Sequence, residues 1–252
     1  MDSHIGLGLR RLAMLGLIAL GLAASFAVQG EPDRYDKARR ALVEEVAAEA
    51  RLIELETGRP GLQPRVLQAL RTVPRHLFVD EDLRDEAYEN RPLPIGHGQT
   101  ISQPFIVAIM TDLVDVEEGH RVLEVGTGSG YQAAVLAALG AQVYSIEIIE
   151  ALAESARTRL VQLEYRDIHL RQDDGYYGWP EHGPFDAIVV TAAASHVPPP
   201  LIRQLKPGGR MIIPVGSAFS VQQLVLLTKD SSGEITMRQL LPVRFVPLTG
   251  EH

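Results

Sequence analysis

The sequence predicts an α/β protein built on a doubly wound, mainly parallel sheet, and three observations favour this class. From residue 102 onward, short apolar runs alternate with segments of helical periodicity, which is typical of repeated strand–helix–strand units. One apolar run leads directly into the glycine-rich turn GTGSG (126–130), and a further helical pattern follows that turn. Toward the C-terminus, strand-like runs follow one another without an intervening helix, which predicts an antiparallel edge.

The segment before this alternation predicts an N-terminal helical cap. Residues 33–56 are rich in Ala, Arg, Glu and Leu, and the apolar positions Leu42, Val46, Ala50 and Ile53 follow helical spacing. TGRPGLQP then breaks the helix, since glycine and proline disfavour a helix interior. A second, short helix is expected at 66–70. The stretch LPIGHGQTISQP (93–104) is too broken for a helix and too polar for a buried strand, so it predicts a shaped loop.

The remaining elements follow from the same periodicities. Pro104 suits the first turn of a helix that continues to Val114. Strands are predicted at 121–125, 142–147, 168–172, 185–193 and 211–216, and helices at 131–139, 149–163 and 201–205, the last ended by KPGG. The runs QQLVLLTKD and ITMRQLLPVRFVPL, with a turn at SSGE between them, predict the antiparallel strands. We therefore expect one domain over 31–252, with a cap and loop (31–104), a core (105–216) and C-terminal strands (217–252).

Residues 1–30 differ from the rest of the chain. Arg10 and Arg11 precede an uncharged apolar run at 12–28 with small residues near its end, which predicts a secretory signal peptide. An exported or periplasmic location would follow. The alternatives are an uncleaved membrane anchor, at the short limit for a span, or a start site placed too early on a cytoplasmic protein. No other membrane partner is expected.

Composition excludes several classes of function. The chain has 252 residues, 46% of them hydrophobic, and a formal net charge of -8, so nucleic acid is not expected as a partner. The absence of cysteine excludes disulfides, thiolate metal sites and a cysteine nucleophile. No group of His, Asp and Glu has metal-ligand spacing, which predicts no metal. His97, among turn-forming residues, and His76 are interpreted as structural. The sequence makes no prediction of oligomeric state.

The glycine-rich turn predicts a nucleoside site. Glycines after a first strand let a ligand approach the backbone and the N-terminus of the next helix. A dinucleotide fingerprint needs glycine at position 131, where this chain has Tyr131, and this disfavours a nicotinamide dehydrogenase. The E-x-G-x-G-x-G pattern resembles instead motif I of the Rossmann-like S-adenosylmethionine-dependent methyltransferases. The candidate cofactor-binding residues in it are Glu124, Gly126, Thr127, Gly128 and Gly130.

Acidic residues at the next two strand ends support this interpretation. A carboxylate at Glu147 can bind both ribose hydroxyls, and Asp174, followed by Gly175, could accept a hydrogen bond from an adenine amino group. Acidic groups at successive strand ends suit a cationic sulfonium cofactor and would repel a pyrophosphate. The predicted cofactor is therefore S-adenosyl-L-methionine, with S-adenosyl-L-homocysteine as its product.

Seven motifs spread over 36–250 extend the resemblance to one family. They are VPRHLFV (73–79), LPIGHGQTISQP (93–104), LEVGTGSGYQAAVLA (123–137), DGYYGW (174–179), PFDAIVVTAAA (184–194), QLKPGGRMIIPVG (204–216) and VRFVPL (243–248). Together they resemble the protein-L-isoaspartate O-methyltransferases, and GQTISQP is the most specific of them. The resemblance implies protein repair, in which the free carboxylate of an L-isoaspartyl residue is methylated and the ester passes through a succinimide partly to normal aspartate.

The resemblance also implies roles for individual residues. Ser102 matches the family's active-site serine, and Thr100 lies beside it. Gly126, Gly128, Glu147, Asp174 and Gly175 match cofactor contacts, and Gln222 is assigned with them, while VRFVPL matches a segment that helps to cover the substrate cleft. Two features depart from the family pattern: EARLIELETGRPGL (49–62) lengthens the N-terminal region, and the leader is unusual for a typically cytoplasmic family.

The implied chemistry makes modest demands on the residues. An α-type carboxylate has a pKa of about 3.3–3.7 and is ionised near neutral pH, so no general base is required. Ser102 is therefore expected to orient the substrate and not to act as a nucleophile; the alternative is that it caps the helix beginning at Pro104. Two other functions remain open, a methyltransferase for another carboxylate or small molecule, and a non-catalytic S-adenosylmethionine-binding protein.

Overall fold

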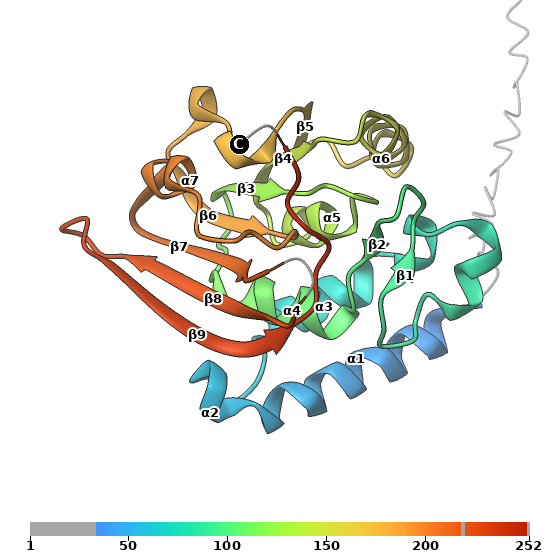
Figure 1. Ribbon diagram of the computed structural model, residues 1–252. Helices are drawn as coiled ribbons and strands as arrows, with labels where there is room; N and C mark the ends of the chain where they lie inside the picture. The colour runs from blue at the N-terminus through green and yellow to red at the C-terminus, as the bar shows by residue number, and fades with distance from the viewer. Residues whose placement is uncertain (1–33, 218–219, 251–252) are drawn as a thin grey trace, which may run out of the picture. The chain divides into compact units, whose positions relative to one another are not determined.

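The computed structural model describes residues 34–217 and 220–250, so the predicted leader at 1–30 lies outside the described residues. Within that part of the chain, no helix is long and apolar enough to cross a membrane. The main feature is a seven-stranded sheet with the order β5-β4-β3-β6-β7-β8-β9 (Figure 1). Its strands are β3 (Arg121–Val125), β4 (Gln142–Glu147), β5 (Ile168–Gln172), β6 (Phe185–Val190), β7 (Leu205–Val215), β8 (Gln222–Lys229) and β9 (Ile235–Val243).

The pairing confirms the predicted doubly wound, mainly parallel sheet with an antiparallel edge. Strands β5, β4, β3, β6 and β7 are parallel, whereas β8 and β9 pair antiparallel to their neighbours. The chain moves outward from β3 through β4 to β5, and then crosses back to add β6 on the other side of β3. This reversal creates a switch point at the carboxyl ends of β3 and β6, where open α/β sheets bind their ligands.

Helices cover both faces of the sheet because successive strand residues point to opposite sides. Val122 belongs to one buried apolar cluster and its neighbour Leu123 to the other. The first cluster includes residues of α1 (Asp36–Leu52), α3 (Pro64–Thr72), α4 (Pro104–Leu113), α5 (Tyr131–Ala137) and α6 (Glu150–Gln162), and the second includes Leu201 of α7 (Pro199–Arg203). Most residues of the central strands are buried and apolar, as expected for strands covered on both faces, and Glu124, Ser145 and Glu147 are buried polar exceptions.

The N-terminal cap forms as expected, with a break that the sequence pattern placed later. Helix α1 buries Leu42, Val46 and Ala50, ends at Leu52, and is followed by the single turn α2 (Glu54–Thr57). Two short 3-10 segments, η1 (Arg75–Phe78) and η2 (Glu81–Glu86), connect α3 to the shaped loop. That loop contains a two-stranded ribbon of β1 (Leu93–Pro94) and β2 (Thr100–Ile101), which the sequence analysis did not predict. Two more 3-10 segments, η3 (Gly175–Tyr177) and η4 (Pro180–His182), precede β6.

Three predicted boundaries are wrong. KPGG was expected to end a helix, but α7 already ends at Arg203 and β7 begins at Leu205, which is buried opposite Phe185 before the register shifts. Tertiary pairing here overrides the local preference of proline and glycine. The strand predicted at 185–193 stops at Val190, and the last predicted strand stops at Val243. Residues 244–250, here called the strap, instead cross the carboxyl end of the sheet, with one isolated bridge between Ala193 and Pro247.

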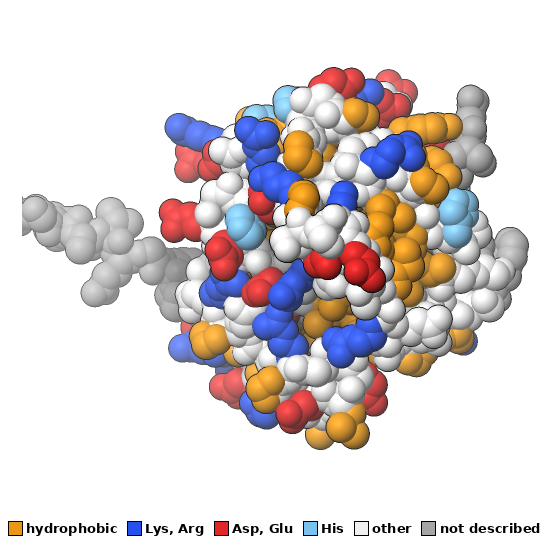
Figure 2. Space-filling view, turned by 90° about the vertical axis from the view of Figure 1, so that its left-hand side faces the viewer, with side chains coloured by type: hydrophobic (Ala, Val, Ile, Leu, Met, Phe, Trp, Pro, Cys, Tyr) orange, Lys and Arg blue, Asp and Glu red, His pale blue; other side chains and the backbone are white. Residues whose placement is uncertain are grey.

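Charged side chains of both signs are interspersed on the face seen in Figure 2, which also carries a group of hydrophobic side chains. Lysine and arginine do not form a continuous stripe on that face. This face therefore has no continuous basic surface of the kind that binds a phosphate backbone.

Candidate active site

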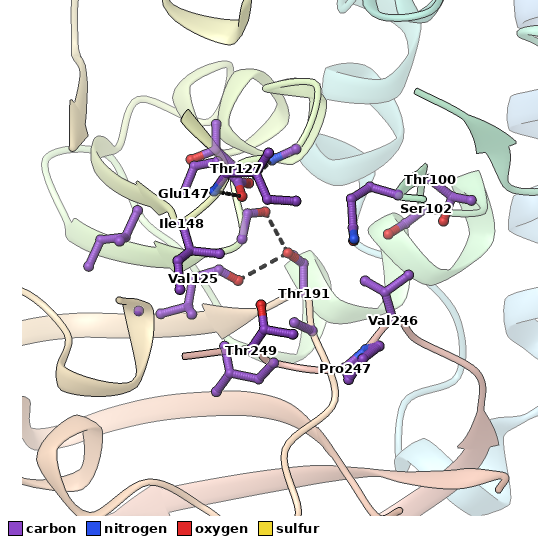
Figure 3. A pocket seen from close by; sticks show the side chains of 18 of the residues that line it. Thr100, Ser102, Val125, Thr127, Glu147, Ile148, Thr191, Val246, Pro247 and Thr249 are labelled. Atoms are coloured by element: carbon purple, nitrogen blue, oxygen red, sulfur yellow. Dashed lines mark hydrogen bonds between the residues drawn. The ribbon is translucent and has the colours of Figure 1, made fainter. Parts of the chain in front are cut away.

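A pocket lies at the switch point of the sheet, a common position for small-molecule sites in open α/β folds. Six segments line it: the glycine loop after β3, the turn after β4, Gly175 after β5, the segment after β6, the end of the shaped loop and the strap. Figure 3 shows side chains of this lining. The predicted site residues that line it are Thr100, Ser102, Gly126, Thr127, Gly128, Glu147 and Gly175. The structure thus brings together residues far apart in the sequence.

The glycine loop is shaped by contacts that leave no space for side chains. Gly126 has a φ of 97°, and a Cβ there would lie 2.5 Å from the Oγ1 atom of Thr191. The N–H groups of Gly126 and Thr127 donate to the carbonyl of Ile146, at 2.8 and 3.1 Å, which holds the loop against the end of β4. Backbone rather than side chain therefore faces the pocket at this point, as a closely bound nucleoside requires.

Glu147 is the only charged residue among the described residues that line this pocket. Its Oε2 atom accepts a hydrogen bond from the N–H of Gly128 at 2.8 Å, and Oε1 accepts one from the N–H of Ile149 at 3.0 Å. These bonds fix the carboxylate between the glycine loop and the turn into α6, while each oxygen keeps further acceptor capacity. A fixed carboxylate in an otherwise uncharged pocket suits a ligand with hydroxyl groups or positive charge, and disfavours a phosphate.

Glu124 lies beneath the glycine loop and does not line the pocket. It is fully buried, and its Oε2 atom accepts a 2.5 Å hydrogen bond from the hydroxyl of Ser145, which in turn lies 2.6 Å from that of Thr127. Burial raises the pKa of Glu124 to about 8, with a smaller contribution from the charge of Glu147. Glu124 was predicted to bind the cofactor. In the structure its side chain instead supports Thr127 from below, through the hydroxyl of Ser145.

Gly130, Gly175 and Asp174 occupy three different positions around the pocket. Gly130 lies behind it, at the start of α5, with a φ of 89° and close packing against Leu160. Gly175 lines the pocket, and Val125 leaves no space for a side chain there. Asp174 accepts a 2.9 Å hydrogen bond from the N–H of Tyr176, and Gly250 of the strap packs directly against its carboxylate. Asp174 is therefore adjacent to the pocket but is not among its lining residues.

Gln222 holds the strap. It is buried, its Oε1 atom accepts a hydrogen bond from the N–H of Phe245 at 2.9 Å, and its Nε2 atom donates to the carbonyl of Ser217 at 3.2 Å. Ala193 adds two backbone bonds to the strap, with Val246 at 2.8 Å and with Leu248 at 2.7 Å. Gln222 does not line this pocket, nor the second pocket described below. Its predicted role in cofactor binding would therefore be indirect, through the position of the strap.

A second pocket adjoins the first on the side of the shaped loop. The two pockets share Thr100, Ser102, Thr191 and Val246, and the second is lined as well by residues of the shaped loop, α4 and the end of β9. The hydroxyl of Thr191 is used within the fold, since it donates to the carbonyl of Gly126 at 2.6 Å. Those of Thr100 and Ser102 have no hydrogen-bond partner among residues 34–217 and 220–250, so two unpaired hydroxyls lie at the junction.

The alternative role of Ser102 as a helix cap is not realised. The N-cap residue of α4 is Gln103, and no side chain makes a capping hydrogen bond there. His97 lies at the tip of the ribbon with a φ of 53°, exposed, and lines neither pocket. His76 is engaged within the cap, where its Nδ1 atom lies 2.8 Å from the hydroxyl of Tyr88 and its ring stacks on Tyr35. The contacts of His76 agree with its interpretation as structural, and the interpretation of His97 stays a prediction.

Arg75, which was not among the predicted site residues, is a buried residue that connects the shaped loop to the glycine loop. Its Nε atom donates to the carbonyl of Ala87 at 2.9 Å, and Nη2 donates to that of Arg91, just before the shaped loop, at 3.3 Å. Its guanidinium lies 4.9 Å from the ring centroid of Tyr131, the first residue after the glycine loop. Burial lowers the pKa of Arg75 to about 10, and Nη1 has no hydrogen-bond partner in the described part of the chain.

Other lining residues were also missed. Thr191 follows β6 directly, but the predicted strand ran on to 193 and concealed its position at a strand end. Ser129 and Ile148 line the pocket beside predicted residues, and Val246 to Thr249 line it from the strap. The general rule that ligands bind at the carboxyl ends of parallel strands would have indicated Thr191 and Ile148. Nothing in the local sequence indicates that the strap reaches the first pocket.

A Rossmann-like sheet with a glycine loop and one fixed acid at its switch point is a nucleoside-binding arrangement, and the S-adenosylmethionine-dependent methyltransferases are one class that has it. A family model described as protein-L-isoaspartate(D-aspartate) O-methyltransferase matches residues 48–252, and the chain belongs to this family. The chain is 59% identical over 240 residues to protein-L-isoaspartate O-methyltransferase 2 of Syntrophobacter fumaroxidans, covering 95% of this chain and 97% of that one. It is 63% identical to protein-L-isoaspartate O-methyltransferase 2 of a Polaromonas species, covering 83% of this chain and 100% of the relative.

The fold agrees with a solved structure from Plasmodium falciparum, described as a protein-L-isoaspartate O-methyltransferase in complex with S-adenosyl-L-homocysteine. The two chains are 26% identical, with a TM-score of 0.70, and the match covers 84% of this chain and 98% of the other. The likeness therefore extends beyond the cofactor-binding sheet to most of the chain.

Proposed function

We propose that this protein repairs damaged proteins by transferring a methyl group from S-adenosyl-L-methionine to the free carboxylate of L-isoaspartyl residues. The ester goes on to a succinimide, which opens partly to normal aspartate. The observation that carries the proposal is the pair of unpaired hydroxyls, Thr100 and Ser102, at the junction of two adjoining pockets. One pocket suits the cofactor and the other an acceptor, so the reacting atoms would meet beside these hydroxyls.

The residues of the first pocket fit S-adenosyl-L-methionine. The backbone of Gly126 and Gly128 faces the pocket, and the fixed carboxylate of Glu147 can accept hydrogen bonds from two ribose hydroxyls. Bound there, the cofactor supplies a methyl group on a positively charged sulfur, and S-adenosyl-L-homocysteine is left. An adenine contact by Asp174 stays a prediction, because its carboxylate lies under Gly250 of the strap.

The protein's own contribution to the chemistry is positioning. The carboxylate that accepts the methyl group is ionised near neutral pH, so no residue has to remove a proton. It must, however, lose part of its water to approach the cofactor, and unpaired donors in the site can replace those hydrogen bonds. Ser102 and Thr100 are the donors we assign to this task. Correct alignment of reacting groups can lower a barrier by about 7–11 kcal/mol.

A matched pair of peptides, identical except for isoaspartate or aspartate at one position, tests the proposed activity. The wild-type protein is expected to methylate the isoaspartyl peptide only. Methylation of small carboxylates with neither peptide used would favour a different methyltransferase. Tight binding of S-adenosyl-L-homocysteine with no methylation of any acceptor would favour a non-catalytic binding protein.

Single substitutions test the assigned donors. Ser102→Ala and Thr100→Val are each expected to lower the single-turnover rate by about 10-fold or more, the cost of one hydrogen bond to a charged group. Their affinity for S-adenosyl-L-homocysteine should stay unchanged, because the cofactor pocket keeps Glu147 and the glycine loop. Ser231→Ala, in the exposed turn between β8 and β9, is the control. Equal single-turnover rates for Ser102→Ala and the wild type would refute the role of Ser102.

A further inference from the structure

Arg244 is the only charged residue among the described residues that line the second pocket. The rest of the lining is apolar or neutral, and it includes the hydroxyls of Thr100 and Ser102 at the junction. With a net charge of -8 on the whole chain, one cation in such a lining is the natural partner for a negative group of the acceptor.

The guanidinium of Arg244 is also available. It is exposed, and no residue in the described part of the chain makes an ion pair or side-chain hydrogen bond with it. Arg91, which precedes Pro92 on the opposite wall, differs in this respect because Glu86 and Glu89 both pair with it. Arg210 is likewise engaged, by Asp115 at 3.5 Å. Arg244 therefore keeps its donors for a group that comes from outside the protein.

The position of Arg244 indicates which group that is. The carboxylate to be methylated must lie at the junction of the two pockets, beside Thr100 and Ser102, to reach the cofactor. Arg244 lines the second pocket but not the first, and its side chain is exposed, so it lies on the acceptor side of the junction. A second negative group, on a residue near the isoaspartate in the peptide chain, would meet it.

We propose that Arg244 is a specificity-determining residue that favours isoaspartyl peptides with an acidic side chain close to the damaged residue. The proposal rests on the proposed function, since it takes the second pocket as the peptide site. An exposed ion pair changes affinity by about two- to five-fold and is weakened by salt. The preference is expected in KM, with kcat unchanged, because the contact is made equally before and during methyl transfer.

The test uses one isoaspartyl peptide with Glu, Gln or Lys placed in turn at each of the three positions on either side of the isoaspartate. We expect the wild type to prefer Glu over Gln by about two- to five-fold in kcat/KM at one or more positions, and to disfavour Lys. Arg244→Gln should abolish this order, and high salt should reduce it. Arg166→Gln makes the same change in charge at an exposed position before β5, at the opposite end of the sheet, and should keep it.

Equal use of the Glu, Gln and Lys peptides at every position by the wild type, or an unchanged preference in Arg244→Gln, would overturn the proposal while the methylation itself stood. A lack of methylation of every isoaspartyl peptide would instead overturn the proposed function, and this inference with it. A fall in kcat for all peptides alike in Arg244→Gln would also contradict it, since that result indicates a general role of the strap.

Discussion

Replacement of Gln222 by leucine removes two side-chain hydrogen bonds, and the one with Phe245 holds the start of the strap. The substitution nearly conserves volume, so the main change is that the N–H of Phe245 loses its side-chain acceptor. The carbonyl of Ser217 still accepts hydrogen bonds from the N–H and the hydroxyl of Ser220. A polar group left unpaired away from water costs about 1–3 kcal/mol. Phe245 is only partly buried, which places the expected cost to the strap at about 1–2 kcal/mol.

This cost predicts a specific pattern of binding. The strap lines both pockets. If the strap is in its ordered position in a smaller fraction of molecules, the affinity for each ligand falls by the same factor. About 1–2 kcal/mol corresponds to roughly 5- to 30-fold. Calorimetric titration with S-adenosyl-L-homocysteine and the KM for an isoaspartyl peptide should both change by a factor in this range. Gln239→Leu, the same substitution at an exposed position of β9, is the control.

The outcome separates two roles of Gln222. Weaker cofactor binding with an unchanged peptide KM would refute the strap argument and support the direct cofactor contact that the sequence predicts. Unchanged values for both ligands would show that the Ala193 bonds alone hold the strap. Thermal unfolding of each variant checks that the effect is local, since a general loss of stability would also lower the midpoint.

Three further predictions concern the floor and the back of the site. Gly126→Ala should lower affinity for S-adenosyl-L-homocysteine at least 10-fold in a calorimetric titration, because the new Cβ would lie 2.5 Å from Thr191; Gly119→Ala, with a similar φ of 80° but open space around it, should not. Glu124 binds its proton more tightly when folded, so its contribution to stability should be lost as pH rises from about 4.5 to about 8. In denaturant unfolding, the stability of Glu124→Gln relative to the wild type should therefore rise across that pH window, by an amount on the order of several kcal/mol. A difference in unfolding free energy that does not change with pH would contradict this. Arg75→Met should cost about 1–3 kcal/mol of stability and raise the peptide KM, because the carbonyls of Ala87 and Arg91 lose a charged donor. Arg75→Lys should recover stability in urea more fully than peptide KM, because one ammonium cannot reach both carbonyls in the same geometry.

The fold could be predicted where one physical cause dominates. Strands β3 and β4 begin and end at the predicted residues, because a strand covered on both faces needs a mostly apolar run that is clear in the sequence. The bounds of the edge strand β5 were predicted as well, although none of its residues is buried. The start of β7 could not be predicted. Leu205 joins the sheet by pairing with Phe185, whereas the proline and glycines that follow it disfavour a strand. Pairing with a strand distant in sequence is not visible in the local pattern.

The same limit applies to the candidate site. Glycine positions and Glu147 were predictable because the glycine loop and strand ends are local features. Glu124 and Gln222 were expected at the cofactor, yet their side chains point to Ser145 and to Phe245. A motif gives the order of residues along the chain, but the direction of a side chain depends on what packs around it. Arg75 escaped notice for the same reason, since its partners are backbone carbonyls.

The division of the site between two sets of segments has a consequence for how such enzymes diversify. The ends of β3, β4 and β6 form the floor of the first pocket, whereas the wall of the second comes mainly from residues 92–106 and 242–246. Only the second set would have to change for the acceptor to change, and the methyl-donor floor could be inherited intact. Grafting these two segments from one family member onto another is thus the smallest exchange that should carry acceptor preference with it.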